Sequence, residues 1–290
     1  MTHARLAAAI RFGSILLVGS LLSTTVAFAQ TAVGQTAAAD GTVPRASDGH
    51  PSLGGLWGGA NGALPTGEGV ELFAGRGGTF YGFEEDNGLA RMATLNKPVY
   101  KPAYWDQIKE NDYDGDFGNG LDPRDSCFPE GLPRIGAPSA IVQVPDQNLV
   151  VFRYATGFDG RSESRFIPTD GRPHNAANAA SETWYGDSVG HWDGDTLVID
   201  TTGFTDQSWL HKNGYIHGFN MDVVERIVRK GNQFTWTATV TDPDYLQQPW
   251  TMDPIVKNLN TAPNGFLAED LPCSVDGARA DHVIDHTRSG

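Results

Sequence analysis

The stretch from Arg172 to Arg226 concentrates side chains that enzymes use to move protons and to bind anions. A histidine with a neighbouring carboxylate can transfer protons near neutral pH. An arginine in the same pocket can hold a carboxylate or a phenolate through a bidentate contact. The alternative is an ordinary polar rim with ion pairs that close hairpins. The residues concerned are Arg172, His174, Asp187, His191, Asp195, Asp206, Trp209, His211, His217, Glu225 and Arg226.

Position along the chain selects two histidines from this cluster. His174 follows an Asp-Gly turn at 170–171 and a proline, so it is expected at the end of a strand. His217 lies in the connection 214–218, which has a glycine at each end. Histidines in loops at one rim of a sheet are free to face a ligand. We therefore predict that His174 and His217 share one pocket with Arg172.

The predicted roles follow from these residue types. His174 and His217 transfer protons, and Asp187 or Asp206 orients the imidazole ring. Arg172 binds the anionic end of a substrate. Large aromatic residues belong to a core more often than to a ligand site, and that alternative stays open for the tryptophans. The remaining candidate substrate-binding residues are Trp184, Trp192, Trp209 and Arg226.

Three further motifs match known patterns without the context that the chemistry needs. Gly186 to Gly190 reads G-x-S-x-G, but a hydrolase elbow needs a helix after the serine, and a hairpin pattern follows Ser188. Residues 112–122 imitate an EF-hand loop but lack the glycine of its sharp turn, so only an irregular calcium site stays open there. His282 and His286 have the spacing of two metal ligands on a helix, with no third ligand indicated. We therefore expect no metal and no cofactor.

The elements that must position these residues are short strands. Runs rich in β-branched and aromatic residues predict strands, and the strict alternation at 233–241 is typical of a half-buried antiparallel strand. Turn residues predict hairpins at 145–148, 193–194 and 230–232, the second as a type I′ turn. A short helix is expected near 100–109. The expected strands are 140–144, 148–154, 164–167, 196–202, 222–229 and 233–241.

This pattern predicts the fold class. At least six short strands with tight turns and few helices favour a mainly β protein, an antiparallel β-barrel or sandwich. Within that class we expect a lipocalin-like barrel. We see no internal repeat and no domain linker, so residues 50–290 are expected to form a single β-rich domain.

The first residues read as an export signal. Two arginines precede a short apolar run, and the small-x-small sequence at 27–29 predicts cleavage, so residues 1–29 are expected to be a signal peptide. The apolar run is too short and too interrupted for a membrane anchor. Residues 30–49 lack a hydrophobic period and are expected to form a flexible leader. The mature protein is then periplasmic or secreted.

Charge and cysteine usage bound the partners. The net charge is −14, and removing residues 1–29 takes away two arginines and no acid. Such a charge repels phosphate backbones and anionic lipid, so we expect no nucleic acid partner and no membrane insertion after signal cleavage. Cys127 and Cys273 would meet an oxidising compartment. They either form a disulfide or remain two unrelated thiols.

Four segments carry a resemblance. DPRDSCFPEGLPR at 122–134, TDGRPH at 169–174, WYGDSVGHWDGDTLVIDTTGF at 184–204 and VVERIVR at 223–229 resemble a family of exported proteins of soil and aquatic bacteria. The resemblance implies a shared β core and a common site around these motifs, and it transfers no catalytic role. The C-terminal block typical of that family is replaced here by PCSVDGARADH at 272–282. Its ecological setting suggests degradation of plant-derived or aromatic matter.

Three functions remain open at this point. The first is a cofactor-independent lyase, of the decarboxylase type, that acts on a small aromatic or hydroxy acid, possibly derived from plants or lignin. The second is a periplasmic binding module for a small apolar ligand. The third is an envelope interaction protein without a small-molecule site. Tight histidine–carboxylate contacts facing a pocket would favour the enzyme, whereas an apolar pocket without them would favour the binding module.

Overall fold

The computed structural model describes residues 35–38, 41–58, 96–111, 122–154, 163–211, 214–262, 265 and 267. The chain divides into two compact units, Met1–Thr31 and Ala32–Gly290, and every described residue belongs to the second unit. The expected signal peptide, the acidic loop from 112 to 120, His282 and His286 lie outside the described residues. No helix in the described part of the chain is both long enough and apolar enough to cross a membrane.

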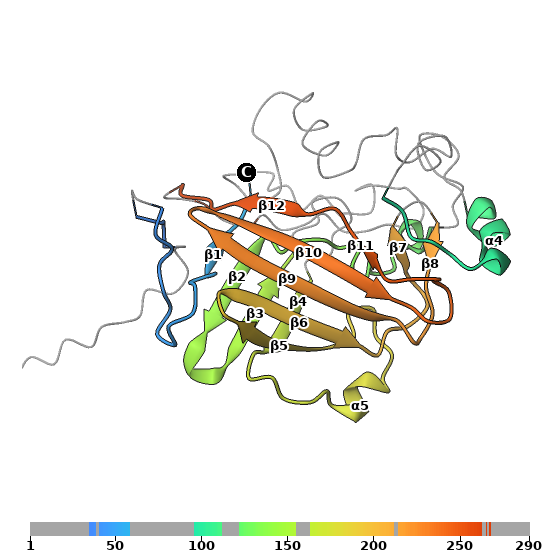
Figure 1. The fold of residues 1–290 in the computed structure, drawn as a ribbon, viewed down its shortest axis with the longest axis horizontal. Helices are drawn as coiled ribbons and strands as arrows, with labels where there is room; N and C mark the ends of the chain where they lie inside the picture. Colours follow the sequence, from blue (N-terminus) through green and yellow to red (C-terminus); the bar gives the residue numbers. More distant parts are fainter. Residues whose placement is uncertain are drawn as a thin grey trace, which may run out of the picture. The chain divides into compact units, whose positions relative to one another are not determined.

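One sheet has four antiparallel strands in the order β1-β2-β3-β4 (Figure 1). The short 3-10 helix η3 (Pro145–Gln147) closes the β2–β3 hairpin at the turn expected from the sequence. The strands are β1 (Gly55–Leu56), β2 (Ala140–Val144), β3 (Leu149–Arg153) and β4 (Ser164–Pro168).

A second sheet has six strands in the order β11-β10-β9-β6-β5, and β12 also pairs with β10. A third sheet consists of β7 (Trp209–His211) and β8 (Tyr215–Ile216). The members of the six-stranded sheet are β5 (Asp187–Asp193), β6 (Thr196–Thr202), β9 (Asp222–Lys230), β10 (Gln233–Thr241), β11 (Trp250–Thr251) and β12 (Ile255–Asn258).

Helices are few and short in the described residues. The expected helix near 100–109 is found as the 3-10 turn η1 (Pro102–Tyr104) followed by α4 (Trp105–Glu110). A second 3-10 turn, η2 (Pro123–Ser126), begins after Asp122, whose side chain accepts a hydrogen bond from the Arg124 backbone N–H. The remaining helix is α5 (Ala176–Ala179).

The hairpins expected at 193–194 and 230–232 are found, but the first does not have the expected type I′ turn. Asp193 pairs with Thr196, so Gly194 and Asp195 are the two central residues of the β5–β6 turn. Gly194 has a φ of 58°, whereas Asp195 is not among the described residues with positive φ. A type I′ turn needs positive φ at both positions, so this turn has the pattern of type II′, with glycine first.

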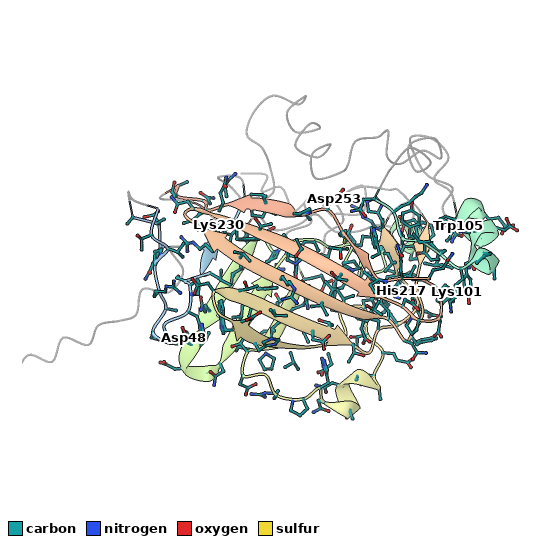
Figure 2. All side chains as sticks on the ribbon, in the orientation of Figure 1. Asp48, Lys101, Trp105, His217, Lys230 and Asp253 are labelled. Carbon is teal, nitrogen blue, oxygen red and sulfur yellow. The ribbon has the colours of Figure 1, made fainter. Side chains whose placement is uncertain are left out.

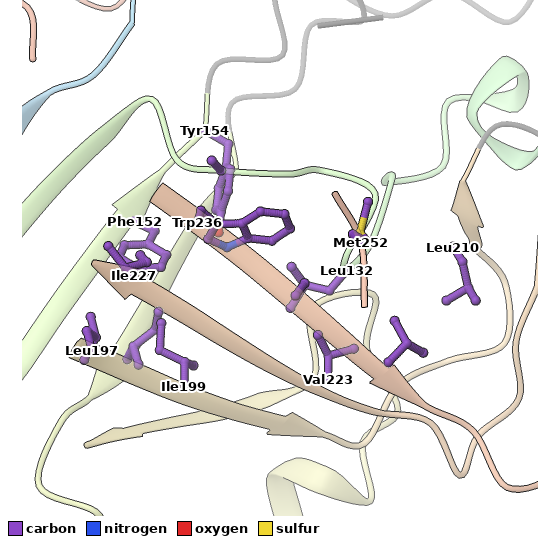
Figure 3. Close-up of a cluster of buried hydrophobic side chains, with 14 of the residues drawn as sticks. Leu132, Phe152, Tyr154, Leu197, Ile199, Leu210, Val223, Ile227, Trp236 and Met252 are labelled. Atoms are coloured by element: carbon purple, nitrogen blue, oxygen red, sulfur yellow. The ribbon is translucent and has the colours of Figure 1, made fainter. Parts of the chain in front are cut away.

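The core lies where the inner faces of the two larger sheets contribute side chains to one cluster (Figure 3). The alternation predicted for β10 is confirmed, because Phe234, Trp236, Ala238 and Val240 are all fully buried. Phe152 and Ile141 enter the same cluster from β3 and β2. Burial of large apolar side chains on both sheets is the main stabilising contribution to this fold.

The described residues are mainly antiparallel β, as predicted, but their sheets are open, so the expected lipocalin-like closed barrel is not found among them. A closed barrel would need continuous ladders at both seams between the two larger sheets. At one seam, β1 and β12 are continued by an isolated antiparallel bridge between Trp57 and Leu259. At the other seam, the edge strands are β4 and β5. In the described residues, one backbone hydrogen bond, from Gly171 N to Gly190 O at 2.9 Å, joins the segment after β4 to β5. β4 also ends at Pro168, which has no N–H to donate to a ladder.

The segment expected to be a flexible leader makes specific contacts where it is described. Arg45 forms a bidentate ion pair with Asp195 in the β5–β6 turn, at 2.5 and 2.8 Å. The Ala37 N–H donates to Asn232 in the β9–β10 turn. Arg229 of β9 donates to the carbonyl oxygens of Gln35 and Ser52. This stretch therefore contacts the two hairpins of the six-stranded sheet.

Candidate functional site

A cleft of about 750 Å³ opens where β4 approaches the start of β5. Its wall includes side chains of the segment that runs from β4 through α5 to β5. Both polar and apolar atoms line it. The lining residues are Ser164, Arg165, Phe166, Pro168, Arg172, Pro173, His174, Asn175, Asn178, Ser181, Thr183, Tyr185, Gly186, Asp187, Ser188 and Val189.

His174 is placed in this wall by a turn and a helix start. Gly171 adopts a left-handed conformation with φ of 67°, which reverses the chain after β4. Asn175 caps α5, since its side chain accepts hydrogen bonds from the backbone N–H groups of Ala177 and Asn178. Between turn and cap, the His174 ring reaches β5, where its Nδ1 lies 3.0 Å from Asp187 Oδ2.

Asp187 is held by three donors. Its Oδ2 also accepts from the Asn175 backbone N–H at 3.0 Å, and its Oδ1 accepts from Asn178 Nδ2 at 3.0 Å. Burial alone would raise the pKa of this carboxyl, but the hydrogen bonds from Asn178, Asn175 and His174 outweigh it and hold the pKa below its usual value. Asp187 therefore stays negatively charged at neutral pH and fixes the orientation of the imidazole ring.

The other ring nitrogen of His174 lies near a second carboxylate. His174 Nε2 is 3.5 Å from Oδ2 of Asp200 on β6, whose side chain is 54% exposed. Since Asp187 occupies Nδ1, Nε2 is the atom that can exchange a proton with a bound molecule.

Behind the cleft lies a buried polar network centred on Arg165 of β4. Its Nη2 forms a 2.7 Å ion pair with Glu225 Oε2 of β9, and the two side chains are 3% and 0% exposed. Burial alone would lower the pKa of Arg165, but the negative charge of Glu225 outweighs it and raises the pKa above its usual value. Arg165 Nη1 donates to the Tyr154 hydroxyl at 3.0 Å, and the Trp236 indole donates to Glu225 Oε1 at 2.9 Å.

The same guanidinium organises two hydroxyl groups. Arg165 Nη2 donates to Ser188 Oγ at 2.8 Å and to Thr201 Oγ1 at 3.2 Å. The two hydroxyl oxygens are 3.0 Å apart. Ser188 lines the cleft, whereas Thr201 is fully buried. The cleft therefore has a polar floor that is connected to the buried ion pair.

Arg172 lines the cleft, as its predicted role requires, but it already has a carboxylate partner. Its Nε and Nη2 donate to Asp170 at 2.8 and 2.7 Å. The hydrogen bonds from Arg172 lower the pKa of Asp170 to about 2. This exposed pair leaves Nη1 of Arg172 uninvolved in the contact with Asp170.

His217 does not join His174. It is 2% exposed, its Nε2 lies 2.9 Å from Ser208 Oγ, and its Nδ1 lies 3.3 Å from the carbonyl oxygen of Gly218. Burial lowers its pKa. His217 is not among the residues that line the cleft, and Figure 2 shows it at the far end of the strands from Asp48 and Lys230. The expected common pocket of the two histidines is therefore not found, because His217 faces the core and not a loop rim.

The remaining predicted site residues also lie away from the cleft lining. Asp206 and Arg226 are exposed. The Trp192 ring stacks on His50, with centroids 4.6 Å apart, and Trp184 packs against Phe128. Trp209 is buried in the core. Of the nine predicted site residues, the cleft wall contains His174, Asp187 and Arg172.

Three residues of the site were not singled out from the sequence. The burial of Arg165 could be inferred from strand alternation, because Arg165 is two residues from Ile167 and so lies on the same face of β4. Asp200 was visible only as a charge in the apolar run of β6, and nothing in the sequence connected it to His174. Asn178 gave no signal beyond its place after Asn175.

No group of three or more histidine, cysteine or acidic residues is arranged to hold a metal ion in the residues that the structure describes. Comparisons of the chain with protein-family models, with curated proteins and with solved structures found no match.

Proposed function

We propose that this protein is an exported, cofactor-independent enzyme that binds a small substrate in the cleft and catalyses a lyase reaction by proton transfer. The observation that supports it most is the 3.0 Å contact between His174 Nδ1 and Asp187 Oδ2 in the cleft wall. General acid–base catalysis needs a histidine that faces the ligand and has one ring nitrogen held by a carboxylate, so that the other nitrogen can transfer a proton.

The proposed reaction is a decarboxylation of a small aromatic or hydroxy acid. The bond between the carboxylate carbon and its neighbour breaks, carbon dioxide leaves, and the electron pair stays on the remaining carbon. His174 Nε2 donates a proton to that carbon, and solvent returns the proton to the ring. Asp187 and Asp200 lie where they stabilise the positive charge that His174 carries before the transfer.

Other residues of the cleft suit such a substrate. Phe166 lines it and is 68% exposed, so its ring offers an apolar surface to an aromatic or aliphatic group. Arg172 can bind a carboxylate through Nη1, because an exposed pair such as that with Asp170 is weak and competes poorly. A binding module would need the tryptophans at the ligand. Since Trp184, Trp192 and Trp209 are not among the lining residues, we prefer the enzyme.

Export to the periplasm or medium, and kinship with the exported bacterial family, complete the proposal and rest on the sequence motifs. We also propose that the two larger sheets form a sandwich-like pair, since both contribute to one core and Arg165 pairs with Glu225 between them.

The test is turnover by the mature protein on a panel of hydroxycinnamic, hydroxybenzoic and aliphatic hydroxy acids, followed by carbon dioxide release and chromatography. His174→Gln should lower kcat by about 10²- to 10⁴-fold. The matched control is His191→Gln, an exposed histidine of β5 that does not line the cleft, and it should keep full activity. Full activity of His174→Gln, or no turnover of any acid by the wild type, would contradict the proposal.

A further inference from the structure

We infer that Ser188 is a substrate-binding residue that donates a hydrogen bond to an oxygen of the ligand, with its proton directed into the cleft by Thr201 and Arg165. This inference deepens the proposed function, and rests on it only for taking the cleft as the substrate site. It gives the serine of the G-x-S-x-G motif a role in binding.

The first step is to exclude nucleophilic chemistry. β5 runs from Asp187 to Asp193, so Ser188 lies near the start of a strand. The elbow of a hydrolase requires a helix directly after the serine, and here the strand continues instead. The described hydrogen bonds of Ser188 Oγ go to Arg165 and Thr201, and neither residue is a base that can take its proton. Ser188 therefore lacks the activation that a nucleophile needs.

The second step is a count of protons. A guanidinium has only donors, so Ser188 and Thr201 both accept from Arg165. One hydrogen bond then joins the two hydroxyl groups, and one hydroxyl proton is left over. Thr201 is fully buried, and its described hydroxyl partners are Arg165 and Ser188. A buried hydroxyl proton without an acceptor is costly, so Thr201 must donate to Ser188.

The third step concerns the proton that remains. When Thr201 donates, the Ser188 oxygen accepts two hydrogen bonds, one of them from a cation, and its own proton is unused. Ser188 lines the cleft, so this proton is available to a ligand. Accepting bonds on the oxygen polarises the hydroxyl and strengthens it as a donor. The Glu225–Arg165 ion pair keeps the guanidinium in place and balances its charge.

The ligand chemistry follows. A lone donor at the floor of the cleft takes an oxygen acceptor, which is the carboxylate of an acid or the carbonyl group of an uncharged relative. We therefore expect 4-hydroxybenzoate and 4-hydroxybenzamide to bind through Ser188. p-Cresol has the same ring and phenol but lacks this acceptor, so Ser188 should contribute nothing to its binding.

The experiment measures dissociation constants of these three probes by calorimetry or NMR titration. Ser188→Ala should weaken the binding of 4-hydroxybenzoate by about tenfold or more, weaken that of the benzamide less, and leave p-cresol unchanged. The matched control is Ser181→Ala, because Ser181 also lines the cleft but donates to the carbonyl oxygen of Ala177. Equal loss for all three probes, or none, would overturn the inference, as would no binding of the two acceptor probes by the wild type.

Thr201 tests the direction of the proton. In our assignment Thr201→Val removes a donor to Ser188, so the affinity for 4-hydroxybenzoate should fall, and Thr201→Ser should keep the wild-type affinity. If Ser188 instead donates to Thr201, the valine variant frees the serine proton and the affinity rises, which would refute the assignment.

One further measurement keeps the inference testable. If Ser188→Ala does not fold, a crystal structure of the wild type with 4-hydroxybenzoate must place an acceptor oxygen within hydrogen-bond distance of Ser188 Oγ, and any other pose contradicts it. Binding does not depend on turnover, so the two proposals can fail separately. Ser188-dependent binding without turnover would reject only the lyase, and turnover with unchanged binding in Ser188→Ala would reject only this inference.

Discussion

Arg165 of β4 and Glu225 of β9 belong to different sheets, and their buried side chains form an ion pair at 2.7 Å. Such a pair gives little net stability relative to apolar residues, but removal of one partner leaves a buried charge. We therefore expect Glu225→Gln to lower the free energy of unfolding by about 3 to 5 kcal/mol.

Urea denaturation checks this prediction. The control is Asp195→Asn, which breaks the Arg45–Asp195 pair, whose side chains are 49% and 59% exposed. Loss of this exposed pair should lower the free energy of unfolding far less than loss of the buried pair, because solvent screens the two charges. Equal effects of the two variants would show that the Arg165–Glu225 pair is not desolvated as described.

Asp187→Asn should separate orientation from binding. The amide cannot serve the three donors from His174, Asn175 and Asn178 as the carboxylate does, so the imidazole loses its fixed orientation. We expect kcat of the proposed reaction to fall by about 10²-fold or more, with a small change in KM. Steady-state kinetics measures this split, and Asp193→Asn, an exposed position of the same strand, serves as the control.

The same carboxyl gives a pH dependence of stability. The folded-state pKa of Asp187 is lower than the unfolded value of about 3.9. Its contribution to the free energy of unfolding is therefore complete above about pH 4 and is lost as the pH falls through the folded-state pKa. Chemical denaturation at pH 3 and pH 6 should show a smaller acid loss in Asp187→Asn than in the wild type.

His217 should behave as a structural residue. Burial lowers its pKa in the folded state, so the unfolded chain binds its proton more readily, and stability is lost as the pH falls below the unfolded value of about 6.5. Denaturation between pH 7.5 and 5 should show this loss in the wild type. In His217→Gln the slope should be smaller, and the variant should be less stable at every pH because its contact with Ser208 is disturbed.

The contrast with His191→Gln makes the result decisive. His191 is exposed, so its replacement should leave both the stability and its pH slope unchanged. A wild-type slope in His217→Gln would mean that other groups cause the acid loss.

The cysteine pairing remains a prediction. Cys127 is disulfide-bonded, and Cys273, the second of two cysteines in the chain, lies outside the described residues. Thiol titration of the denatured, unreduced protein should find no free sulfhydryl, and Cys273→Ala should expose one. Because the bond closes a long loop, its loss should cost about 2 to 4 kcal/mol. Two reactive thiols in the exported protein would contradict the pairing.

Two glycines offer a matched test of how α5 is seated. Gly203 and Gly194 both have positive φ, but an added Cβ at Gly203 would lie 2.5 Å from the backbone of Ala179, whereas none would meet Gly194 within 4 Å. Gly203→Ala should therefore displace α5, which carries Asn178, and reduce both stability and turnover. Gly194→Ala should cost only about 1 kcal/mol of backbone strain and leave turnover intact. Similar kinetics of the two variants would mean that α5 does not position the site.

Local patterns predicted the strands well, and the reason is visible in β9 and β10. Each alternates with a period of two, so one face is buried along the whole strand. Open edges could not be predicted, because whether β4 pairs with β5 depends on contacts between segments that no local pattern relates. Arg165 shows the same limit. Alternation places Arg165 on the buried face beside Ile167 and leaves Phe166 exposed. The buried charge of Arg165 is tolerated because it pairs with Glu225, which lies sixty residues further along the chain.

The site was predicted in part for the same reason. His174 follows turn residues and precedes a helix cap, which are local signals, but it lies in the connection between β4 and α5 and not at the strand end where it was expected. His217 has similar local signals. The neighbouring Gly218, however, packs against Tyr245, and the Gly218 backbone N–H donates to the buried Asp242 side chain. Burial of a glycine-flanked loop by a distant turn is a tertiary effect that a sequence does not display.

The contacts of residues 35–52 bear on the order in which this chain folds. Their partners Asp195, Arg229 and Asn232 lie 150 to 195 residues later in the sequence. In a chain that emerges from its N-terminus, Gln35, Ala37 and Arg45 cannot make these contacts until the β5–β6 and β9–β10 hairpins exist. Contacts of such long range are slow to form. The docking of this segment is therefore a late step. Protection of the chain near residue 45 from a protease during refolding would report when the second half of the chain has folded.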